Sequence, residues 1–285
     1  MAAGECSDRA LNLTDHIISM NPAHYTVWLF RFKIISTMDL PVQEEIAWLN
    51  DVALTHLKNY QIWHHRHLLM DHYHPQIADD KDAVAKLARS ETEFITHMLS
   101  ADTKNYHVWS YRQYLVRKLG IFNLQELLST QNWIEADVRN NSAWSHRFFV
   151  VFSDPQNSTE GKHSTESDEK VSAETVDREI RYTKEKIEVA PQNQAAWNYL
   201  RGVLVKGGRK VSSVKEFCEM FVKNLGDAEK EDVKSTHALD ALADAYLDER
   251  ENEKARLCLT RLAEKWDPIR SGYWKYREQM MDAQA

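Results

Sequence analysis

The sequence predicts an all-α protein in which helical hairpins stack in one array of the tetratricopeptide type. Three observations lead to this fold class. A tryptophan-centred motif recurs along the 285 residues, the apolar residues between its copies follow helical spacing, and the chain contains only eight glycines and six prolines. Few turn-forming residues favour long helices over a turn-rich β fold. We therefore expect residues 1–285 to form a single repeat domain.

The repeated motif reads Asn or His, usually Tyr, two variable residues, Trp, two more residues and Arg. Its copies are centred on Trp28, Trp63, Trp109, Trp144 and Trp197, and the last copy has lost the Arg. The steps between these tryptophans are 35, 46, 35 and 53 residues. A helical hairpin of this class takes about 34 residues. The two longer steps are therefore expected to carry insertions.

Each step is expected to contain two helices joined by a turn. In residues 44–57, Ile46, Leu49, Val52 and Ala53 recur at spacings of three and four, which gives one apolar helix face. A second apolar helix follows and includes residues 62–69. The two helices pack through these faces in the predicted hairpin.

The motif residues themselves indicate caps and packing. An asparagine stands four residues before four of the tryptophans, where a helix N-cap is required: Asn59, Asn105, Asn140 and Asn193. The Trp and the Arg three residues later share a helix face. We interpret the Trp as a wedge between neighbouring hairpins, with the Arg paired or stacked beside it.

Two segments are interpreted as insertions. Residues 74–90 lengthen the second step and are expected to form a loop followed by a helix. Residues 154–174 have almost no apolar side chains, so we expect a mobile, solvated loop there. After residue 208 the repeat loosens, and helices within about 212–281 are expected to cap the array.

Composition and short motifs exclude several classes of function. The formal net charge of −7 gives no basic field for nucleic acid. No apolar run approaches the roughly 20 residues that span a bilayer, and the first ten residues lack a secretory signal, so no membrane insertion is expected. Three widely spaced cysteines fit reduced thiols in a cytoplasmic protein. In the histidine-rich run 64–74, His64 and His67 are three residues apart, not four, so packing is favoured over a metal site.

Cations immediately precede three of the capping asparagines: Lys58, Lys104 and Arg139. Equivalent positions of a stacked array lie along one edge, and here each is beside a helix N-terminus, which attracts anions. The residues that follow supply hydrogen-bond donors on the same edge: Tyr60, Gln61, Tyr106 and His107. The sequence thus indicates a local anion site, with ordinary exposed turn cations as the alternative.

Three segments resemble the repeats of the α subunit shared by protein farnesyltransferase and protein geranylgeranyltransferase type I. They are LKNYQIWHHR (57–66), TKNYHVWSYR (103–112) and VRNNSAWSHR (138–147), and the similarity extends to residues 9–28 and 190–202. The resemblance implies a right-handed α-α superhelix, a crescent wrapped around a β subunit in an obligate heterodimer. Such an enzyme transfers a farnesyl or geranylgeranyl group from the isoprenoid diphosphate to the cysteine of a C-terminal CaaX sequence.

The resemblance also implies roles for individual residues. Lys58 matches the lysine that reaches the diphosphate, and Gln61 matches the glutamine that contacts the carboxylate of the peptide. Four further residues match positions lining the subunit interface and substrate cleft: Tyr60, Asn105, Tyr106 and His107. The resemblance implies that the β subunit holds the zinc, with or without magnesium, and that this chain binds no metal or cofactor itself.

Two other functions are open to a protein with these repeats. The α subunit of Rab geranylgeranyltransferase is one, although the KNYQ and KNYH motifs fit it less well. The other is a non-catalytic helical scaffold that binds partner peptides on its concave face. A chain that needs an obligate partner should aggregate or express poorly alone, which distinguishes the first family from the scaffold.

Overall fold

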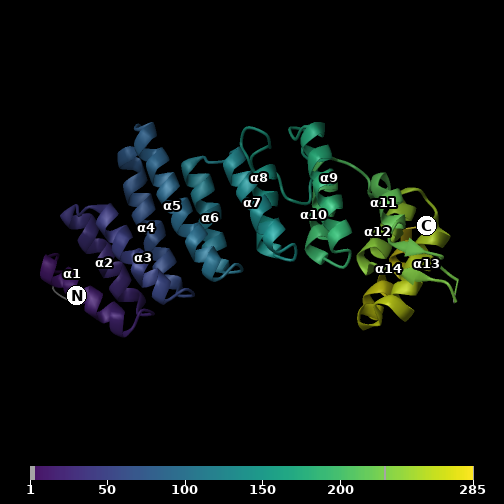
Figure 1. The fold of residues 1–285 in the computed structure, drawn as a ribbon, viewed down its shortest axis with the longest axis horizontal. Coiled ribbons are helices and arrows are strands. Elements are labelled where there is room, and N and C mark those ends of the chain that lie inside the picture. The colour runs from purple at the N-terminus through teal and green to yellow at the C-terminus, as the bar shows by residue number, and fades with distance from the viewer. Residues whose placement is uncertain (1–3, 228, 285) are drawn as a thin grey trace. The chain divides into compact units, whose positions relative to one another are not determined.

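Repeated helical hairpins make up the computed structural model, which describes residues 4–227 and 229–284 (Figure 1). The prediction of an all-α fold built from hairpins is confirmed, apart from two short strands described below. Contacts divide the chain into two compact units, residues 1–123 and 124–285. A single domain over residues 1–285 stays a prediction, and residues 1–3, 228 and 285 lie outside the described structure.

The first unit holds three hairpins, with helices α1 (Asp8–Met20), α2 (Tyr25–Met38), α3 (Val42–Thr55), α4 (Tyr60–Ile77), α5 (Lys81–Ala101) and α6 (Tyr106–Leu119). The second unit continues with α7 (Leu124–Ala136), α8 (Asn141–Phe152), α9 (Ala173–Val189) and α10 (Gln194–Lys206). Its C-terminal part contains α11 (Lys215–Glu219), β1 (Val222–Lys223), β2 (Asp232–Val233), α12 (Thr236–Asp248), α13 (Asn252–Arg261) and α14 (Ser271–Gln284).

Helix contacts within each unit follow the repeat. Each first helix packs on the second helix of its own hairpin, as α3 does on α4 and α9 on α10. The second helices also pack on one another, α2 on α4 and α4 on α6 in the first unit, and α8 on α10 in the second. Each unit therefore has an inner layer of second helices, and the buried motif tryptophans lie in it.

The motif asparagine has two tasks, of which the sequence revealed one. As predicted, its side-chain oxygen caps the helix that follows, and Asn59 Oδ1 accepts from the Gln61 N–H at 2.8 Å. In addition, Asn59 Nδ2 donates to the Pro22 carbonyl of the preceding turn at 2.8 Å, and the Trp28 indole donates to the same oxygen at 2.8 Å. The second unit repeats this arrangement with Asn193, Trp144 and the Val138 carbonyl. The motif therefore joins neighbouring hairpins through one shared carbonyl.

Each motif arginine with a described partner pairs with a glutamate on the first helix of the next hairpin. Arg66 on α4 is fully buried, and its Nε and Nη2 donate to the two carboxylate oxygens of Glu91 on α5 at 2.8 and 2.7 Å. The same two-pronged contact joins two further pairs, Arg31–Glu45 and Arg147–Glu179. The expectation that the motif arginine is paired is confirmed, and the structure identifies the glutamate acceptor, which the sequence analysis did not name.

The same glutamates accept a second bond from within their own hairpin. His65 Nε2 donates to Glu45 at 2.7 Å, and Tyr111 and Tyr199 donate to Glu91 and Glu179. Burial alone would raise the pKa of the Glu45 carboxyl, but hydrogen bonds from His65 and Arg31 outweigh it and the pKa is lowered. Burial also lowers the pKa of His65, so this histidine is neutral and serves as a buried hydrogen-bond donor to Glu45.

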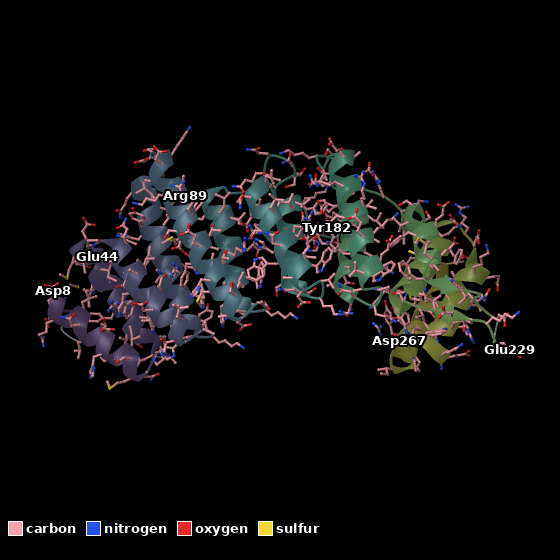
Figure 2. All side chains as sticks on the ribbon, viewed as in Figure 1. Asp8, Glu44, Arg89, Tyr182, Glu229 and Asp267 are labelled. Atoms are coloured by element: carbon pink, nitrogen blue, oxygen red, sulfur yellow. The ribbon has the colours of Figure 1, made fainter. Side chains whose placement is uncertain are left out.

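The Arg147 pair in the second unit has an aromatic neighbour. The Arg147 guanidinium lies 3.9 Å from the centre of the Tyr182 ring, and Tyr182 projects from α9 into the interior of the unit (Figure 2). A guanidinium placed over an aromatic face gains about 0.5–2 kcal/mol, more when desolvated. The contact adds to the ion pair that joins α8 to α9.

The expected loop followed by a helix within residues 74–90 is present, and the loop is short. Helix α4 continues through Pro75 to Ile77, only residues 78–80 are non-helical, and Asp80 caps α5 by accepting from the Asp82 and Ala83 N–H groups. Three alanines in residues 83–88 favour helix, which explains why the extra residues lengthen the hairpin. The insertion therefore extends helices α4 and α5.

The second insertion contains neither helix nor strand from residue 153 to 172, as expected. It is nevertheless held by specific contacts. The buried Asp168 carboxylate accepts from the Thr159 N–H at 2.8 Å and from its hydroxyl at 2.7 Å. The buried Lys206 ammonium on α10 donates to the His163 carbonyl at 2.7 Å. The Asp168 bonds hold the segment to itself and the Lys206 bond anchors it to α10, while its mobility stays a prediction.

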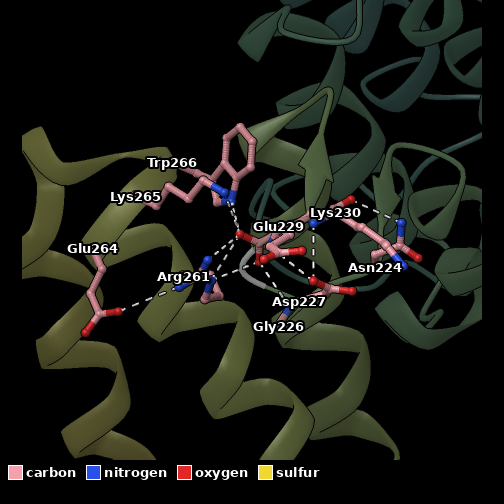
Figure 3. Close-up of polar contacts among 10 residues, drawn as sticks. Asn224, Gly226, Asp227, Glu229, Lys230, Arg261, Glu264, Lys265 and Trp266 are labelled. Carbon is pink, nitrogen blue, oxygen red and sulfur yellow. Dashed lines mark hydrogen bonds and ion pairs between the residues drawn. The ribbon is translucent and has the colours of Figure 1, made fainter.

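The C-terminal part contains the expected helices and a β-hairpin that the sequence did not predict. Strands β1 and β2 pair antiparallel, with Val222 opposite Val233. Beside them Arg261, Lys265 and Trp266 converge (Figure 3), and all three donate to the Glu231 carboxylate. The Arg261 hydrogen bond, with the bonds from Gly226, Lys265 and Trp266, lowers the pKa of Glu231 to about 2. This charged cluster fixes a hairpin too short to show any periodicity of its own.

Candidate active-site rim

Two neighbouring turns of the first unit, with the first residues of the helices that follow them, carry the six residues to which the resemblance gave roles. We call this surface the rim and define it as residues 58–61 with residues 102–107. Both turns share one geometry, in which the N–H of the capping asparagine donates to the carbonyl three residues earlier, at 3.0 Å from Asn59 to His56 and at 3.1 Å from Asn105 to Asp102. The rim is therefore built from the regular repeat turn.

Asn105 connects the two turns of the rim. Its Oδ1 caps α6 by accepting from the His107 N–H at 3.0 Å, and its Nδ2 donates to the Leu57 carbonyl at 2.8 Å. Leu57 directly precedes Lys58 in the chain. Asn105 is itself buried, so it positions the lysine turn from beneath. The sequence assigned Asn105 to the site by resemblance, and its described contacts are structural.

Lys58 projects from the rim into solvent. Its side chain is 78% exposed, and its Nζ lies 3.6 Å from Oδ2 of Asp102, whose side chain is 26% exposed. The lysine stands two residues before the N-terminus of α4, where the helix dipole favours an anion. A positive side chain next to a helix N-terminus is a suitable site for a phosphate group.

Aromatic rings surround the lysine. Tyr60 is 61% exposed, and its ring lies 6.1 Å from that of His107 on the neighbouring hairpin and 6.4 Å from that of His64 on the next turn of α4. Burial lowers the pKa of His107, so this imidazole is neutral near pH 7. The rim thus combines the cations of Lys58 and Lys104 with an exposed, uncharged aromatic surface.

The remaining predicted residues fall on the same surface or outside this unit. Tyr106 is 68% exposed and its ring lies 4.9 Å from that of His107. Gln61 is partly buried at the second position of α4. Lys104 is exposed in the rim, whereas Arg139 belongs to the second unit. Of the predicted row of three cations, the structure brings two into one unit.

The turn that carries Lys58 lacks one bond that other turns have. The indoles of Trp28, Trp109, Trp144 and Trp197 each donate to the carbonyl six residues earlier, at 2.8–2.9 Å. Trp63 is buried as they are, yet its Nε1 has no hydrogen-bond partner. The Leu57 carbonyl, which stands at the equivalent position, accepts from Asn105 instead. The Leu57 carbonyl therefore accepts one described side-chain bond, where the Pro22 and Val138 carbonyls each accept two.

Three further features of the described residues complete the description. Among residues 4–227 and 229–284, no group of three or more His, Cys, Asp or Glu side chains is arranged to hold a metal ion. No helix in those residues is long and apolar enough to cross a membrane. A hollow of about 350 Å³ in the second unit is lined by Trp144, Phe148 and Tyr199, among others, and contains none of the predicted site residues.

Sequence reasoning missed Asp102 and the glutamate acceptors. Asp102 stands two residues before Lys104 in an ordinary turn, so nothing in the sequence marks it as the partner of Lys58. The glutamates carried a signal that alignment of the repeats reveals. The three acceptors, Glu45, Glu91 and Glu179, each precede a motif tryptophan by 18 residues. Glu126 stands at the same spacing, and its carboxylate lies 2.6 Å from His146 Nε2.

Comparison with known proteins relates these repeats to one family. A sequence model described as "Protein prenyltransferase alpha subunit repeat" matches residues 7–38, 42–73, 88–119, 124–154 and 176–206. The protein farnesyltransferase/geranylgeranyltransferase type-1 subunit alpha of Candida albicans is 37% identical over 279 residues, which cover 97% of this chain and 84% of that protein. The mouse geranylgeranyl transferase type-2 subunit alpha is 25% identical over 214 residues, 71% of this chain and 35% of that protein.

A solved structure resembles the whole fold. It is the Candida albicans protein geranylgeranyltransferase-I complexed with GGPP, and one of its chains aligns with a TM-score of 0.85 at 37% sequence identity. The alignment covers 98% of this chain and 86% of that chain. Both the repeats and their succession along the chain are thus shared with that protein.

Proposed function

This chain belongs to the protein prenyltransferase alpha subunit family, and on that basis we propose that it is the α subunit of a farnesyl/geranylgeranyl type-1 protein prenyltransferase. With a β subunit it transfers a farnesyl or geranylgeranyl group from the isoprenoid diphosphate to the cysteine of a CaaX protein. The observation that carries the proposal is the 37% identity over 97% of the chain to a type-1 α subunit, against 25% over 71% to a type-2 α subunit.

Lys58 is assigned to the diphosphate. During transfer the thiolate sulfur of the peptide forms a bond to C1 of the isoprenoid, the C1–O bond breaks, and the diphosphate leaves with the electron pair of that bond. A positioned ammonium stabilises that growing charge more than it stabilises the substrate. The exposure of Lys58, and its place beside the N-terminus of α4, support this role.

Gln61 is assigned to the terminal carboxylate of the CaaX peptide. An amide donor orients a carboxylate without adding a second positive charge near the diphosphate site. Tyr60, Tyr106 and His107 offer an aromatic surface to the isoprenoid, the peptide or the partner. Asn105 supports this surface from below through the Leu57 carbonyl.

The β subunit is the proposed partner, and the exposed tyrosines support such an interface. Tyr25, Tyr60 and Tyr106 occupy the same motif position, three residues before their tryptophans, and are 63%, 61% and 68% exposed. Large exposed aromatic side chains are typical of protein interfaces. The proposal places the zinc, and any magnesium, with the β subunit. The free cysteines Cys6, Cys218 and Cys258 fit a cytoplasmic enzyme.

The experiment is co-expression with a type-1 β subunit, followed by an assay of prenyl transfer from farnesyl and geranylgeranyl diphosphate to CaaX peptides. We expect Lys58→Ala to lower kcat about a hundredfold, the usual cost of one lost contact to a developing negative charge. Lys86→Ala, at an exposed lysine on α5, is the matched control and should leave kcat unchanged. Gln61→Ala should raise KM for the peptide and leave KM for the diphosphate unchanged.

Three results would count against the proposal. A pure complex that transfers no prenyl group to any CaaX peptide would overturn the function. Full activity of Lys58→Ala, with the heterodimer intact by size-exclusion chromatography, would remove Lys58 from the mechanism. Equal rises in both KM values for Gln61→Ala would remove its assigned role.

A further inference from the structure

Asp102 is the one described residue that pairs with the Lys58 side chain. We infer that Asp102 is a positioning residue. Its carboxylate holds the Lys58 ammonium in the free enzyme, and the ammonium leaves this carboxylate for the diphosphate when the substrate binds. The inference rests on the proposed function, because it concerns the same lysine. It adds a residue from the neighbouring hairpin, and it assigns that residue a restraining effect on the reaction.

Asp102 is itself firmly placed. It is the C-cap that follows α5, and its N–H donates to the Met98 carbonyl at 3.1 Å. Its carbonyl accepts from the Asn105 N–H at 3.1 Å, and its Oδ1 accepts from the Lys104 N–H at 3.3 Å. These bonds leave Oδ2 directed at Lys58, 3.6 Å from its Nζ. The carboxylate is the fixed member of the pair and the lysine is the movable one.

The turn does not require the negative charge of Asp102. Asn21 occupies the equivalent position of the first turn, and its side-chain oxygen accepts from the Ala23 N–H at 3.2 Å. Ala190 occupies the position in the fifth turn and has no such oxygen at all, yet the same turn forms. An amide would therefore serve the turn as well as a carboxylate does. The negative charge of Asp102 therefore serves its ion pair with the Lys58 ammonium and not the turn.

The strength of the pair suits an exchange. A pair as exposed as this one contributes only a few tenths to about 1 kcal/mol, so a diphosphate carrying several charges can displace Asp102. The lysine turn also lacks the indole bond that steadies other turns, because Trp63 Nε1 has no partner. The described contact of the Lys58 ammonium is thus with Asp102 of the neighbouring hairpin and not with its own turn.

The test is kcat/KM for the isoprenoid diphosphate, measured with the heterodimer at fixed, saturating CaaX peptide. Asp102→Asn keeps the turn oxygen and removes the charge, so we expect kcat/KM to rise about twofold to fivefold. In a Lys58→Ala background the same substitution should change kcat/KM by less than half as much on a logarithmic scale. Asp82→Asn, at the far end of α5 and about 30 Å away by helix rise, is the charge-matched control and should have no effect.

A gain of this kind separates positioning from a structural role, since damage to the turn lowers activity. An unchanged or lower kcat/KM for Asp102→Asn overturns the inference. So does an equal gain in the Lys58→Ala background, because Asp102 would then act on the diphosphate directly. Failure of the proposed function looks different, since the wild-type complex would then transfer no prenyl group.

Discussion

Loss of the Arg66 guanidinium is predicted to destabilise the first unit more than any surface change in it. Arg66 and Glu91 are 0% and 1% exposed, and besides the two bonds to Glu91 the guanidinium donates to Asn50 Oδ1 at 2.7 Å. It also lies 3.9 Å from the centre of the Phe94 ring. Arg66→Ala removes all these contacts and leaves the Glu91 carboxylate buried, with Tyr111 as its remaining described partner.

The expected cost follows from the buried charge. Removing one partner of a buried ion pair costs about 3–5 kcal/mol, because the remaining charge is left without compensation. Tyr111→Phe keeps the ion pair and removes one hydrogen bond to a charged group, so it should cost less, about 1.5–3 kcal/mol. Replacing both charged residues, as in Arg66→Met with Glu91→Leu, should recover most of the loss.

Urea unfolding followed by tryptophan fluorescence measures these differences as shifts of the midpoint. Arg89→Ala is the matched control, since Arg89 is exposed on the same unit (Figure 2) and surface changes rarely exceed about 0.5 kcal/mol. Two results would refute the reasoning. One is a cost for Arg66→Ala of under about 1 kcal/mol, and the other is a double variant no more stable than Arg66→Ala.

Two further predictions concern the second unit. The pKa of the Glu231 carboxyl is lowered to about 2 from its ordinary value of 4.5, so its contribution to stability is present above pH 4.5 and is lost as pH falls toward 2. Glu231→Gln should remove this part of the acid dependence in unfolding curves, and an unaltered dependence would contradict it. Asn193→Ser keeps a cap oxygen but cannot reach the Val138 carbonyl, so it should lower the free energy of unfolding by about 1 kcal/mol, against about 2 kcal/mol for Asn193→Ala. Equal losses for the two variants in urea unfolding would contradict the second task of the motif asparagine.

The hairpins were predictable because their signal is local. Apolar spacing and a capping asparagine lie within one turn and one helix, where three- and four-residue periodicity is visible. The glutamates that receive the motif arginines were not predictable from that pattern, because a buried carboxylate looks polar and interrupts the apolar face. Glu91 lies 25 residues after Arg66 in the chain. From the sequence it is interpreted as an exposed helix residue, because the burial of Arg66 is not known at that point.

The C-terminal β-hairpin was not predicted from the sequence, for a different reason. Strands of two residues have no period, and Val222 and Val233 alone do not distinguish a strand from a helix. What holds the hairpin is Glu231, whose partners Arg261 and Lys265 lie 30 and 34 residues further along. A charge cluster of such range leaves no trace in the local sequence.

The candidate site could be predicted only in part, because its residues stand in an ordinary repeat turn and the sequence does not distinguish them from the same positions in other turns. Lys58 was found as a cation beside a helix N-terminus, but its role and that of Gln61 came from family resemblance. The structure adds that Asn105, which appeared to be a cap, also reaches the Leu57 carbonyl 48 residues earlier and so fixes the turn bearing Lys58. Substitution of Asn105 therefore disturbs the stacking of hairpins and the position of the lysine together. Asp102 and Lys58 extend outward from that frame, so charge at the rim can be changed while the stacking bonds beneath it remain.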